Sequence, residues 1–482
     1  MSNVKTRFAP SPTGFMHIGN LRTALYSYLL AKANGGKFIV RIEDTDQVRL
    51  VEGAVDVILN TLRTTGITYD EGPVVGGENG PYIQSERKDI YMKYALELIE
   101  KGQAYYCFCT KERLDELKGD GEFGAGYDRH CRDLPKEEVE KNLAEGKSFV
   151  IRQKMPLEGV TSYEDAIFGH IEMDNSELQD QILIKADGFP TYNFCHIVDD
   201  HLMGVTHVVR GSEYLTSTPK YVLLYDAFGW ERPVYCHLPL LMGKDADGNV
   251  SKLSKRHGAV SFEDLVRDGY LPEAIINYIA FLGWCPKDTN EEFFTLSDLE
   301  KIFDISGISK SPAVFDYDKL LWFNSHYIKG LPLEKFMELA KPFFSEELQK
   351  WAGNEKLCAM IQTRIDKFPQ VNEKAEFVLG LPEFDTELFV NKKNKTTAEM
   401  AKTVLEAAVP ALEACASWDN DSLFERLKKL AEDMGLKAGA VMWIVRIAVS
   451  GLAVTPGGAT ELMTVLGKDE ALSRMKKSLS RL

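Results

Sequence analysis

The spacing of apolar residues changes along the chain, and this change constrains the fold most. From Arg7 to about Phe228, short β-rich runs alternate with amphipathic stretches, for example 38–42 followed by 51–62. Such alternation predicts β–α units around a parallel sheet. Beyond about Leu331, segments such as 397–409, 422–432 and 471–479 have apolar residues spaced by about 3.6 positions, with few β-rich runs between them. The sequence therefore predicts an α/β region followed by an all-helical last third.

Length, net charge and cysteine content exclude some classes of protein. At about 150 residues per domain, 482 residues favour about three domains. The net charge of −15 argues against a protein that coats nucleic acid indiscriminately, because phosphate binding needs Lys and Arg, but it does not exclude a local basic face. Eight scattered cysteines do not form the framework of a small disulfide-rich domain and favour a reducing cytoplasm.

No membrane or export segment is expected. The first residues lack the apolar core of a secretory signal. The apolar stretch 440–454 carries Arg446 and is shorter than the ~20 residues that a spanning helix needs. We expect this stretch to be a buried helix and the protein to be cytoplasmic.

The strongest local signal is the segment 7–20, Arg-Phe-Ala-Pro-Ser-Pro-Thr-Gly-Phe-Met-His-Ile-Gly-Asn, which is followed by an amphipathic run at 21–33. It predicts a strand, a tight turn and a helix whose free N–H groups form an anion site. His17 would then donate a hydrogen bond to a phosphate or face a flat base, and Gly19 would allow close approach. The alternative, a loop whose histidine only caps the helix, is the commoner role of a lone His-x-Gly.

A second candidate segment is 250–258, Val-Ser-Lys-Leu-Ser-Lys-Arg-His-Gly. Lys252 and Lys255 are three positions apart on a loop flanked by serine and glycine. They suit a polyphosphate whose charge grows as a phosphorus–oxygen bond breaks, a reaction that depends on positioning and electrostatics rather than on a protein nucleophile. A basic cluster alone is usually a solvated face. The sequence contains no Walker A string or Rossmann fingerprint that would offer another nucleotide site.

Both segments resemble the HIGH and KMSKS signatures of class I aminoacyl-tRNA synthetases, with Asn20 in place of the last His of HIGH. The strings at 7–14, 41–46 and 190–193 are similar to those of bacterial-type glutamyl-tRNA synthetases. The resemblance continues through 198–211 and reaches the end of the chain. It implies the ATP-dependent attachment of L-glutamate to the 3′-terminal adenosine of tRNA(Glu) through a glutamyl-adenylate.

The resemblance also implies roles for individual residues. The catalytic residues would be His17, Gly19, Lys252 and Lys255, of which the first two seat ATP and the lysines stabilise the leaving pyrophosphate. The ATP site would further include Asn20 and Glu213. The glutamate site would consist of Arg7, Ala9, Ser11, Glu43, Tyr192, His196 and Arg210. Two arginines suit this site because a guanidinium binds a carboxylate through two parallel hydrogen bonds, and Glu43 would face the ammonium group. Mg²⁺ would accompany ATP, without a dedicated protein cage in the sequence.

The implied architecture is α/β, with a doubly wound Rossmann-like catalytic domain at 1–325. An acceptor-binding subdomain would be inserted at about 80–190 and would include a glycine-rich surface loop at 119–126. A KMSKS-loop and stem-contact region would cover about 240–325, and an all-α anticodon-binding region 326–482. The implied partners are tRNA(Glu), ATP and L-glutamate, and the implied state is a monomer.

The last third carries residues that could contact the anticodon. Basic side chains that could form a local positive face recur at Lys392, Lys393, Lys395, Arg426, Lys428, Lys429, Arg474, Lys476, Lys477 and Arg481. Trp418 and Trp443 are candidate platforms for stacking on bases, although core packing is the commoner role of such residues.

Cysteines and acidic pairs suggest metal chemistry. Cys107, Cys109 and Cys131 match three ligands of a zinc site that some family members carry, and Asp133 stands where His would complete it. Either Asp133 closes the site, His130 replaces it, or the thiols line a buried core. The strings 44–46 and 199–200 could also bind metal, but neighbouring carboxylates on a strand point to opposite faces. We expect structural hydrogen bonding there.

Four other kinds of protein could carry similar motifs. Glutaminyl-tRNA synthetase ends in β-barrels, which the helical last third argues against. A shorter relative that glutamylates a tRNA base lacks the anticodon region, and a small nucleotidyltransferase would be shorter than 482 residues. An inactive RNA-binding paralogue would not need to retain His17, Glu43, Arg210 and both lysines. Whether tRNA(Gln) is also charged stays open.

Overall fold

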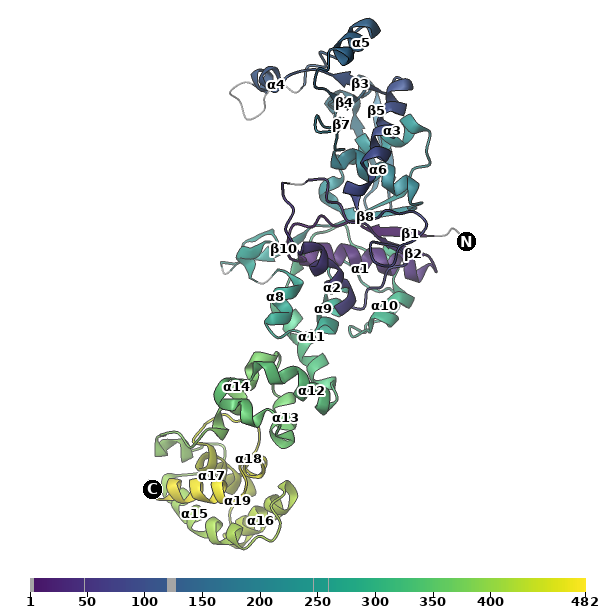
Figure 1. Ribbon diagram of the computed structural model, residues 1–482. Coiled ribbons are helices and arrows are strands. Elements are labelled where there is room, and N and C mark those ends of the chain that lie inside the picture. The colour runs from purple at the N-terminus through teal and green to yellow at the C-terminus, as the bar shows by residue number, and fades with distance from the viewer. Residues whose placement is uncertain (1–3, 47, 119–126, 246, 259) are drawn as a thin grey trace. The chain divides into compact units, whose positions relative to one another are not determined.

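The computed structural model describes residues 4–46, 48–118, 127–245, 247–258 and 260–482. The chain divides into two compact units (Figure 1). Unit 1 consists of Met1–Leu265 and Ile275–Tyr317, and unit 2 of Val266–Ala274 and Asp318–Leu482. The predicted glycine-rich loop at 119–126 lies outside the described residues.

Unit 1 contains short sheets with helices between their strands. The strands are β1 (Lys5–Phe8), β2 (Lys37–Val40), β3 (Ala104–Cys107), β4 (Val150–Gln153), β5 (Val160–Asp165), β6 (Gly169–Asp174), β7 (Ile182–Ile184), β8 (His207–Gly211), β9 (Val234–Leu238), β10 (Leu241–Lys244), β11 (Val250–Lys252) and β12 (Ala313–Phe315). The helices are α1 (Ile18–Ala33), α2 (Ala54–Thr64), α3 (Lys88–Glu100), α4 (Lys111–Lys118), α5 (Lys136–Ala144), α6 (Tyr192–Leu202), α7 (Thr218–Phe228) and α10 (Leu296–Ile302). Helices α8 (Phe262–Arg267) and α9 (Pro272–Ala280) carry the chain across the unit boundaries.

Two β–α–β units bring the ends of parallel strands together. Strand β1 pairs in parallel with β2 across the connecting helix α1, and β8 pairs in parallel with β9 across α7. The first residue of β1, Lys5, accepts a backbone hydrogen bond of 2.9 Å from Thr206, next to the start of β8. This arrangement confirms the predicted parallel α/β core. Ligands of such folds bind beyond the carboxyl ends of the strands, where Arg7 and Arg210 lie.

The sheets of unit 1 also contain antiparallel strand pairs. The four-stranded sheet has the order β6-β5-β9-β8, in which β5 and β6 form an antiparallel hairpin. Strands β3, β4 and β7 form an antiparallel sheet within the predicted insertion. Strand β10 lies between β11 and β12 in a third sheet. Helix α1 packs against β1, β2, β8 and α10 and is buried on nearly all sides, so that even polar residues such as Arg22 and Ser27 of the expected amphipathic run are buried.

Unit 2 is helical, as predicted. Its helices are α11 (Tyr317–Gly330, whose first residue belongs to unit 1), α12 (Leu333–Ala340), α13 (Glu355–Gln362), α14 (Val371–Ala375), α15 (Ala398–Glu413), α16 (Asn420–Asp433), α17 (Ala438–Ser450), α18 (Ala459–Leu466) and α19 (Lys468–Leu479). Helix α17 lies in the core of this unit, which confirms the expected buried helix as far as Ser450, whereas residues 451–454 lie beyond its end and Val454 is exposed. None of the described helices is long and apolar enough to cross a membrane.

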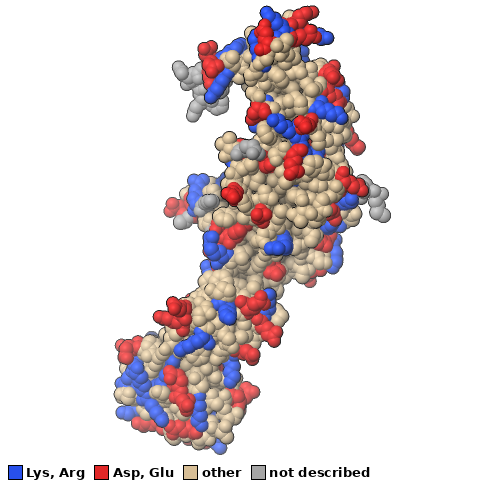
Figure 2. Space-filling model, in the orientation of Figure 1, with Lys and Arg blue, Asp and Glu red and all other residues tan. Residues whose placement is uncertain are grey.

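The basic residues of unit 2 do not all face solvent. Arg474 is buried and donates hydrogen bonds to the carbonyl oxygens of Phe377 and Val449, so its predicted place on a positive face is wrong. Others are paired with acidic side chains on the surface, namely Lys428 with Glu425, Lys476 with Glu413 and Arg481 with Glu383. Figure 2 accordingly shows acidic side chains among the basic ones over unit 2 on the face in view.

The two candidate tryptophan platforms also take part in packing. Trp418 donates its indole N–H to the carbonyl of Met463, and Trp443 donates to that of Leu388. Both rings lie half-buried against the core of unit 2. Their hydrogen bonds fix the rings in place, which is the core-packing role expected as the commoner one.

Candidate functional site

A polar cavity of about 670 Å³ lies in unit 1, where the ends of β1 and β8 meet the start of α1. Its wall brings together residues that are far apart in the sequence. Among the predicted site residues it includes Arg7, Ala9, Ser11, His17, Gly19, Asn20, Glu43, Tyr192, Arg210, Glu213 and Lys252. The described backbone of Lys255 follows in the same loop, whereas its side chain is outside the described part of the structure.

His17 both caps α1 and lines the cavity. Its Nδ1 accepts a hydrogen bond of 3.0 Å from the backbone N–H of Gly19, so the helix begins at Ile18, three residues before the predicted start. Burial, together with the charge of Lys252, lowers the pKa of His17 and keeps the ring neutral near pH 7. Because Nδ1 accepts, the proton of the neutral ring is on Nε2. His17 can therefore cap the helix through Nδ1 and still donate a hydrogen bond to a ligand through Nε2.

Arg210 is a buried cation whose side-chain hydrogen-bond partners are a histidine and a threonine. It is 4% exposed, and its Nε and Nη2 donate to His237 Nε2 (3.1 Å) and Thr218 Oγ1 (2.8 Å). Its Nη1 is buried and has no hydrogen-bond partner, and no described carboxylate forms an ion pair with the guanidinium. Tyrosine rings at 214, 221 and 235 lie within 6 Å of it. A buried charge is normally paired, so this arrangement suits a carboxylate ligand.

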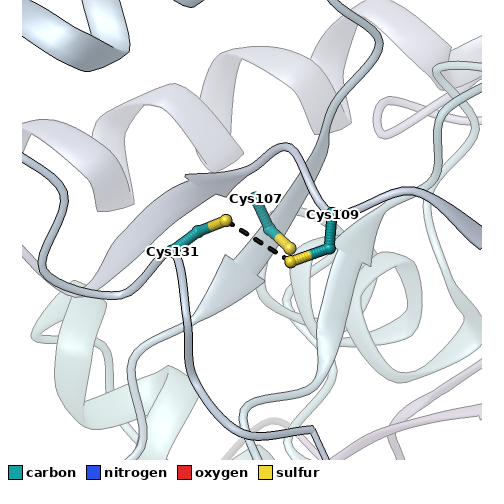
Figure 3. Close-up of side chains that lie close together, drawn as sticks. All are labelled: Cys107, Cys109 and Cys131. Carbon is teal, nitrogen blue, oxygen red and sulfur yellow. Dashed lines mark hydrogen bonds between the residues drawn. The ribbon is translucent and has the colours of Figure 1, made fainter. Parts of the chain in front are cut away.

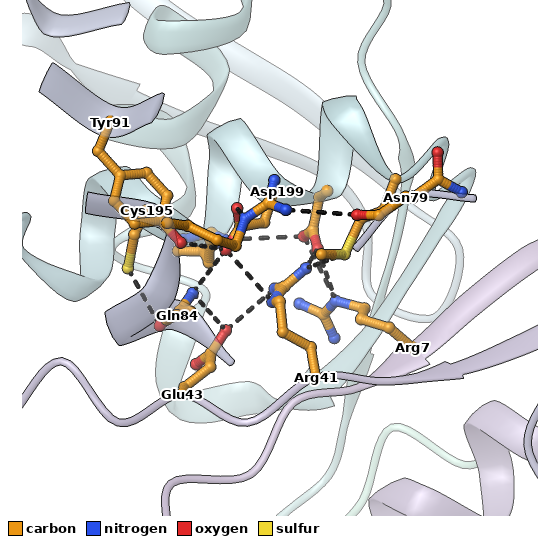
Figure 4. A network of polar contacts seen from close by, with 12 residues as sticks. Arg7, Arg41, Glu43, Asn79, Gln84, Tyr91, Cys195 and Asp199 are labelled. Carbon is orange, nitrogen blue, oxygen red and sulfur yellow. Dashed lines mark hydrogen bonds and ion pairs between the residues drawn. The ribbon is translucent and has the colours of Figure 1, made fainter. Parts of the chain in front are cut away.

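A network of buried charges includes Arg7 and Glu43 of the cavity wall (Figure 4). Arg41 donates to Glu43 Oε1 (3.0 Å) and to Asp200 Oδ1 (2.8 Å), and its Nε lies 3.6 Å from Asp199 Oδ2. Arg7 binds Asp200 through Nε at 3.2 Å. These pairs hold Arg7 at the cavity wall, where its Nη2 has no hydrogen-bond partner among the described residues. The network thereby fixes one cation and Glu43 at the same wall.

Glu43 is the acidic member of this network that lines the cavity close to the arginines. Burial raises the pKa of Glu43, and the guanidiniums of Arg41 and Arg7 oppose that rise. A cation that enters the cavity would also oppose it, because it favours the charged carboxylate. The site thus offers an anion for an ammonium group beside cations for a carboxylate.

The aspartates at 199 and 200 have the expected structural role, but on a different element. They lie on helix α6 rather than on a strand, so the argument from opposite strand faces does not apply to them. Asp199 accepts hydrogen bonds from Arg87 (2.7 Å), Gln84 (2.9 Å) and Tyr91 (2.8 Å). Asp44 is likewise bonded, to the backbone N–H and hydroxyl of Ser85.

Tyr192 lines the cavity, whereas His196 does not. Burial holds the pKa of the Tyr192 phenol well above its usual range, so the hydroxyl stays a donor, and it has no hydrogen-bond partner among the described residues. His196 is buried one turn later on α6, with its ring 4.8 Å from that of Tyr192. The structure therefore differs from the expectation that His196 faces the pocket, since this ring lies behind the tyrosine.

The lysine loop is anchored at both ends. Lys252 ends β11, which pairs with β10, and the chain returns to α1 through backbone hydrogen bonds from Ile18 to Val260 and from Phe262 to Met16. Within the loop, His257 Nδ1 accepts from the backbone N–H of Ser254 (3.1 Å). A Cβ on Gly243 would come within 2.6 Å of the His257 ring, so glycine is needed beneath it. The sequence did not point to His257.

Comparisons with known proteins agree with this geometry. Residues 3–322 match the family described as tRNA synthetases class I (E and Q), catalytic domain, and residues 335–479 match an anticodon binding domain. A glutamate–tRNA ligase of Clostridium novyi is 56% identical over 99% of this chain and 98% of its own length. The chain belongs to the glutamate–tRNA ligase family. A relative from Clostridium botulinum is 53% identical over the whole chain and 99% of its own length.

A solved structure extends the likeness to three dimensions. The crystal structure of a glutamate tRNA ligase from Elizabethkingia meningosepticum in complex with its amino acid is 35% identical to this chain, with a TM-score of 0.88. Each chain is covered completely by the other. The mixed α/β catalytic part followed by a helical part is therefore the fold of this ligase family.

Three thiols gather in the β3–β4 region of unit 1 (Figure 3). The ligand atoms of Cys107, Cys109 and Cys131 all lie within 4.8 Å of one another, and the last two sulfurs are 3.5 Å apart. The hydroxyl of Tyr127 lies 3.2 Å from Cys107 Sγ and 3.9 Å from Cys109 Sγ. Hydrogen bonding by Cys131 lowers the pKa of Cys107 despite burial. The cluster therefore favours a thiolate.

Neither predicted fourth ligand lies in this cluster. The Asp133 side chain is 80% exposed, and its carboxylate accepts from Lys154 Nζ at 2.9 Å. His130 is exposed and is not part of the group either. Tyr127, four residues before Cys131, is the oxygen donor that the structure brings to the sulfurs. The sequence did not point to Tyr127, because a phenol oxygen is not among the usual zinc ligands.

Proposed function

We propose that this chain attaches L-glutamate to the 3′-terminal adenosine of tRNA(Glu) in two ATP-dependent steps. The observation that carries the proposal is the buried Arg210 guanidinium, which has no carboxylate partner among the described residues and lies in the same cavity as Glu43. Glutamate supplies the missing carboxylate and brings an ammonium group for Glu43. The family to which the chain belongs supports the same reaction.

In the first step, an oxygen of the glutamate α-carboxylate attacks the α-phosphorus of ATP, and the bond to the β-phosphate oxygen breaks to release pyrophosphate. Because the α-carboxylate must be free to react, the clamp of Arg7, Arg210 and Tyr192 holds the side-chain carboxylate. Ala9 and Ser11 line the same wall. His196 supports the ring of Tyr192 from behind.

ATP lies along the start of α1 in this proposal. His17 donates from Nε2 to a phosphate, Gly19 and Asn20 border the nucleotide, and Glu213 lies near it. Lys252 and Lys255 stabilise the charge that grows on the leaving pyrophosphate. Mg²⁺, bound mainly through the phosphates of ATP, would neutralise part of their charge.

In the second step, the terminal ribose 2′-hydroxyl of the tRNA attacks the carbonyl carbon of the mixed anhydride, and AMP leaves with the bonding electron pair. We assign residues 1–325 to the catalytic domain, with about 80–190 as the acceptor-binding insertion and about 240–325 as the loop and stem-contact region. Residues 326–482 bind the anticodon. The protein acts as a cytoplasmic monomer.

The proposal is tested by aminoacylation of purified tRNA(Glu) and tRNA(Gln), each with labelled glutamate, ATP and magnesium, and with labelled glutamine as a control. Charging of tRNA(Glu) alone is the expected result for a discriminating enzyme, and charging of both tRNAs would identify a relaxed one. Folded protein that transfers glutamate to neither tRNA would contradict the proposal.

Replacing Arg210 with lysine should reduce kcat/KM for glutamate about ten- to a hundredfold, the range expected for lost charged hydrogen bonds. Lysine keeps the charge but lacks the planar fork that donates two parallel hydrogen bonds to a carboxylate. Steady-state aminoacylation at varied glutamate measures the effect. Arg232→Lys, in an exposed pair with Asp226, is the matched control. Unchanged glutamate kinetics in Arg210→Lys would remove this residue from the pocket.

We further propose that the thiol cluster binds zinc with Tyr127, rather than Asp133, as the fourth donor. Three sulfurs and one oxygen in a close group fit the tetrahedral preference of zinc, which would hold the β3–β4 region together. Tyr127→Phe is expected to weaken zinc binding, whereas Asp133→Asn leaves it unchanged. Metal content after dialysis against a graded chelator checks this. Equal zinc retention by the Tyr127 variant and the wild type would contradict it.

A further inference from the structure

Two buried residues behind the cavity continue the hydrogen bonds of Arg210. His237, on β9, lies opposite Arg210 in the parallel register of β8 and β9, and its Nε2 is 3.1 Å from Arg210 Nε. On the other side of the ring, His237 Nδ1 is 2.6 Å from Asp165 Oδ2. The side chains of His237 and Asp165 are fully buried. Neither residue lines the cavity, and the hydrogen bond between His237 and Arg210 connects them to a residue that does.

The surroundings of Asp165 fix which ring nitrogen carries the proton. Its Oδ1 accepts from the backbone N–H groups of Ile167 (2.9 Å) and Phe168 (2.8 Å), and its Oδ2 accepts from the backbone N–H and Nδ1 of His237. A carboxylate with four donors stays ionised, and hydrogen bonds from His237 and these N–H groups hold the pKa of Asp165 down against burial. His237 Nδ1 therefore carries a proton.

The opposite nitrogen is then free to accept. Burial lowers the pKa of His237, so the ring is neutral near pH 7 and Nε2 has a lone pair. The adjacent Thr218 hydroxyl donates to the carbonyl of Tyr214 (2.8 Å) and accepts from Arg210 Nη2 (2.8 Å). His237 and Thr218 together occupy the side of the guanidinium formed by Nε and Nη2. The end that carries Nη1 is left for a ligand.

We propose that Asp165 and His237 are positioning residues that orient Arg210 for the glutamate side-chain carboxylate. Asp165 sets the tautomer of His237, and His237 holds the Arg210 Nε–H so that the unpartnered end of the fork faces the substrate. This inference rests on the proposed function, because it requires Arg210 to bind glutamate. It adds a second layer to the pocket that the sequence motifs do not contain.

The decisive variant is Asp165→Asn. The amide has one oxygen, and if that oxygen serves the N–H groups of Ile167 and Phe168, its NH₂ group faces His237 Nδ1. Nδ1 must then accept, the ring proton moves to Nε2, and it meets the Nε–H of Arg210 donor to donor. We expect glutamate KM to rise roughly ten- to a hundredfold, as for a buried donor left unsatisfied, without a matching change in ATP KM.

A pair of variants at His237 separates positioning from packing. In His237→Gln, the amide oxygen can still accept from Arg210, whereas His237→Leu fills similar space without an acceptor. We expect glutamate KM to stay near the wild-type value in the first and to rise in the second. Glu71→Gln is the matched control, because Glu71 is a buried, fully bonded carboxylate of unit 1 that does not line the cavity.

The readouts are glutamate KM, ATP KM and kcat for charging of tRNA(Glu), with the melting temperature of each variant. The inference is supported if glutamate KM rises in His237→Leu, which lacks a hydrogen-bond acceptor, but not in His237→Gln, which keeps one. Equal effects of Gln and Leu, or parallel losses in both KM values, kcat and melting temperature, would overturn it and leave a packing role. A wild-type protein that charges no tRNA would overturn the proposed function, and the inference with it.

Discussion

Replacing Lys252 with alanine is expected to slow glutamyl-adenylate formation about 10²- to 10³-fold, the range seen when one donor is removed from a site of developing charge. Lys252 lines the cavity at the end of β11, and no ion-pair partner holds it among the described residues. In the proposed mechanism its charge matters most when pyrophosphate leaves, so glutamate KM should change far less than the rate.

The rate is measured in single turnovers with saturating glutamate, ATP and tRNA(Glu). Lys244→Ala is the control, since Lys244 lies on the neighbouring strand β10 but not at the cavity wall. Losses of the same size in the rate and in glutamate binding would count against a role in the transition state. The same comparison applies to Lys255.

Replacing Arg41 with methionine is expected to destabilise unit 1 by about 3–5 kcal/mol, the cost of leaving a buried ion pair without one partner. Arg41 is fully buried and contacts three carboxylates, from Glu43, Asp199 and Asp200. Without it, Arg7 and Arg87 are left to balance all three. Urea titration, followed by hydrogen exchange of α6 amides, measures the change. Arg232→Met, in an exposed pair, should cost only about 0–1 kcal/mol.

The loss of stability in the Arg41→Met variant should depend on pH. Burial raises the pKa of Asp200, but Arg7 and Arg41 outweigh burial and hold it well below its usual value. A lowered folded pKa contributes stability above the unfolded pKa of about 3.9, and this stability is lost as the pH falls. The difference between variant and wild type should therefore be largest near pH 7 and shrink in acid. A difference independent of pH would indicate lost packing instead.

The sequence predicted those features that depend on local patterns. Apolar spacing was enough to place α1, α15, α16 and the buried α17, and strings near the strand ends were enough to nominate the cavity wall. Such signals are local because a helix or a turn depends on residues a few positions apart. A local pattern can also be misleading. Arg474 lies near other basic residues in the sequence and was therefore expected on the surface, but it is buried.

The sequence did not predict the contacts between residues that lie far apart in the chain. Asp165 and His237 are 72 positions apart, and neither belongs to a recognisable motif. Tyr127 reaches the thiols, and His196 turns behind Tyr192, because of packing that no spacing rule describes. The strand geometry expected for Asp199 and Asp200 was wrong, because both residues belong to helix α6.

The unpaired guanidinium of Arg210 has a consequence for accuracy. Glutamine has nearly the same shape as glutamate, so the walls of a cavity distinguish the two poorly. If glutamine took the place of glutamate in the proposed site, its neutral amide would leave the buried Arg210 guanidinium without an anion. A buried charge without a partner is costly. The error rate of this ligase should therefore depend on charge rather than on size. Since the guanidinium is shielded from water, added salt should affect the discrimination little.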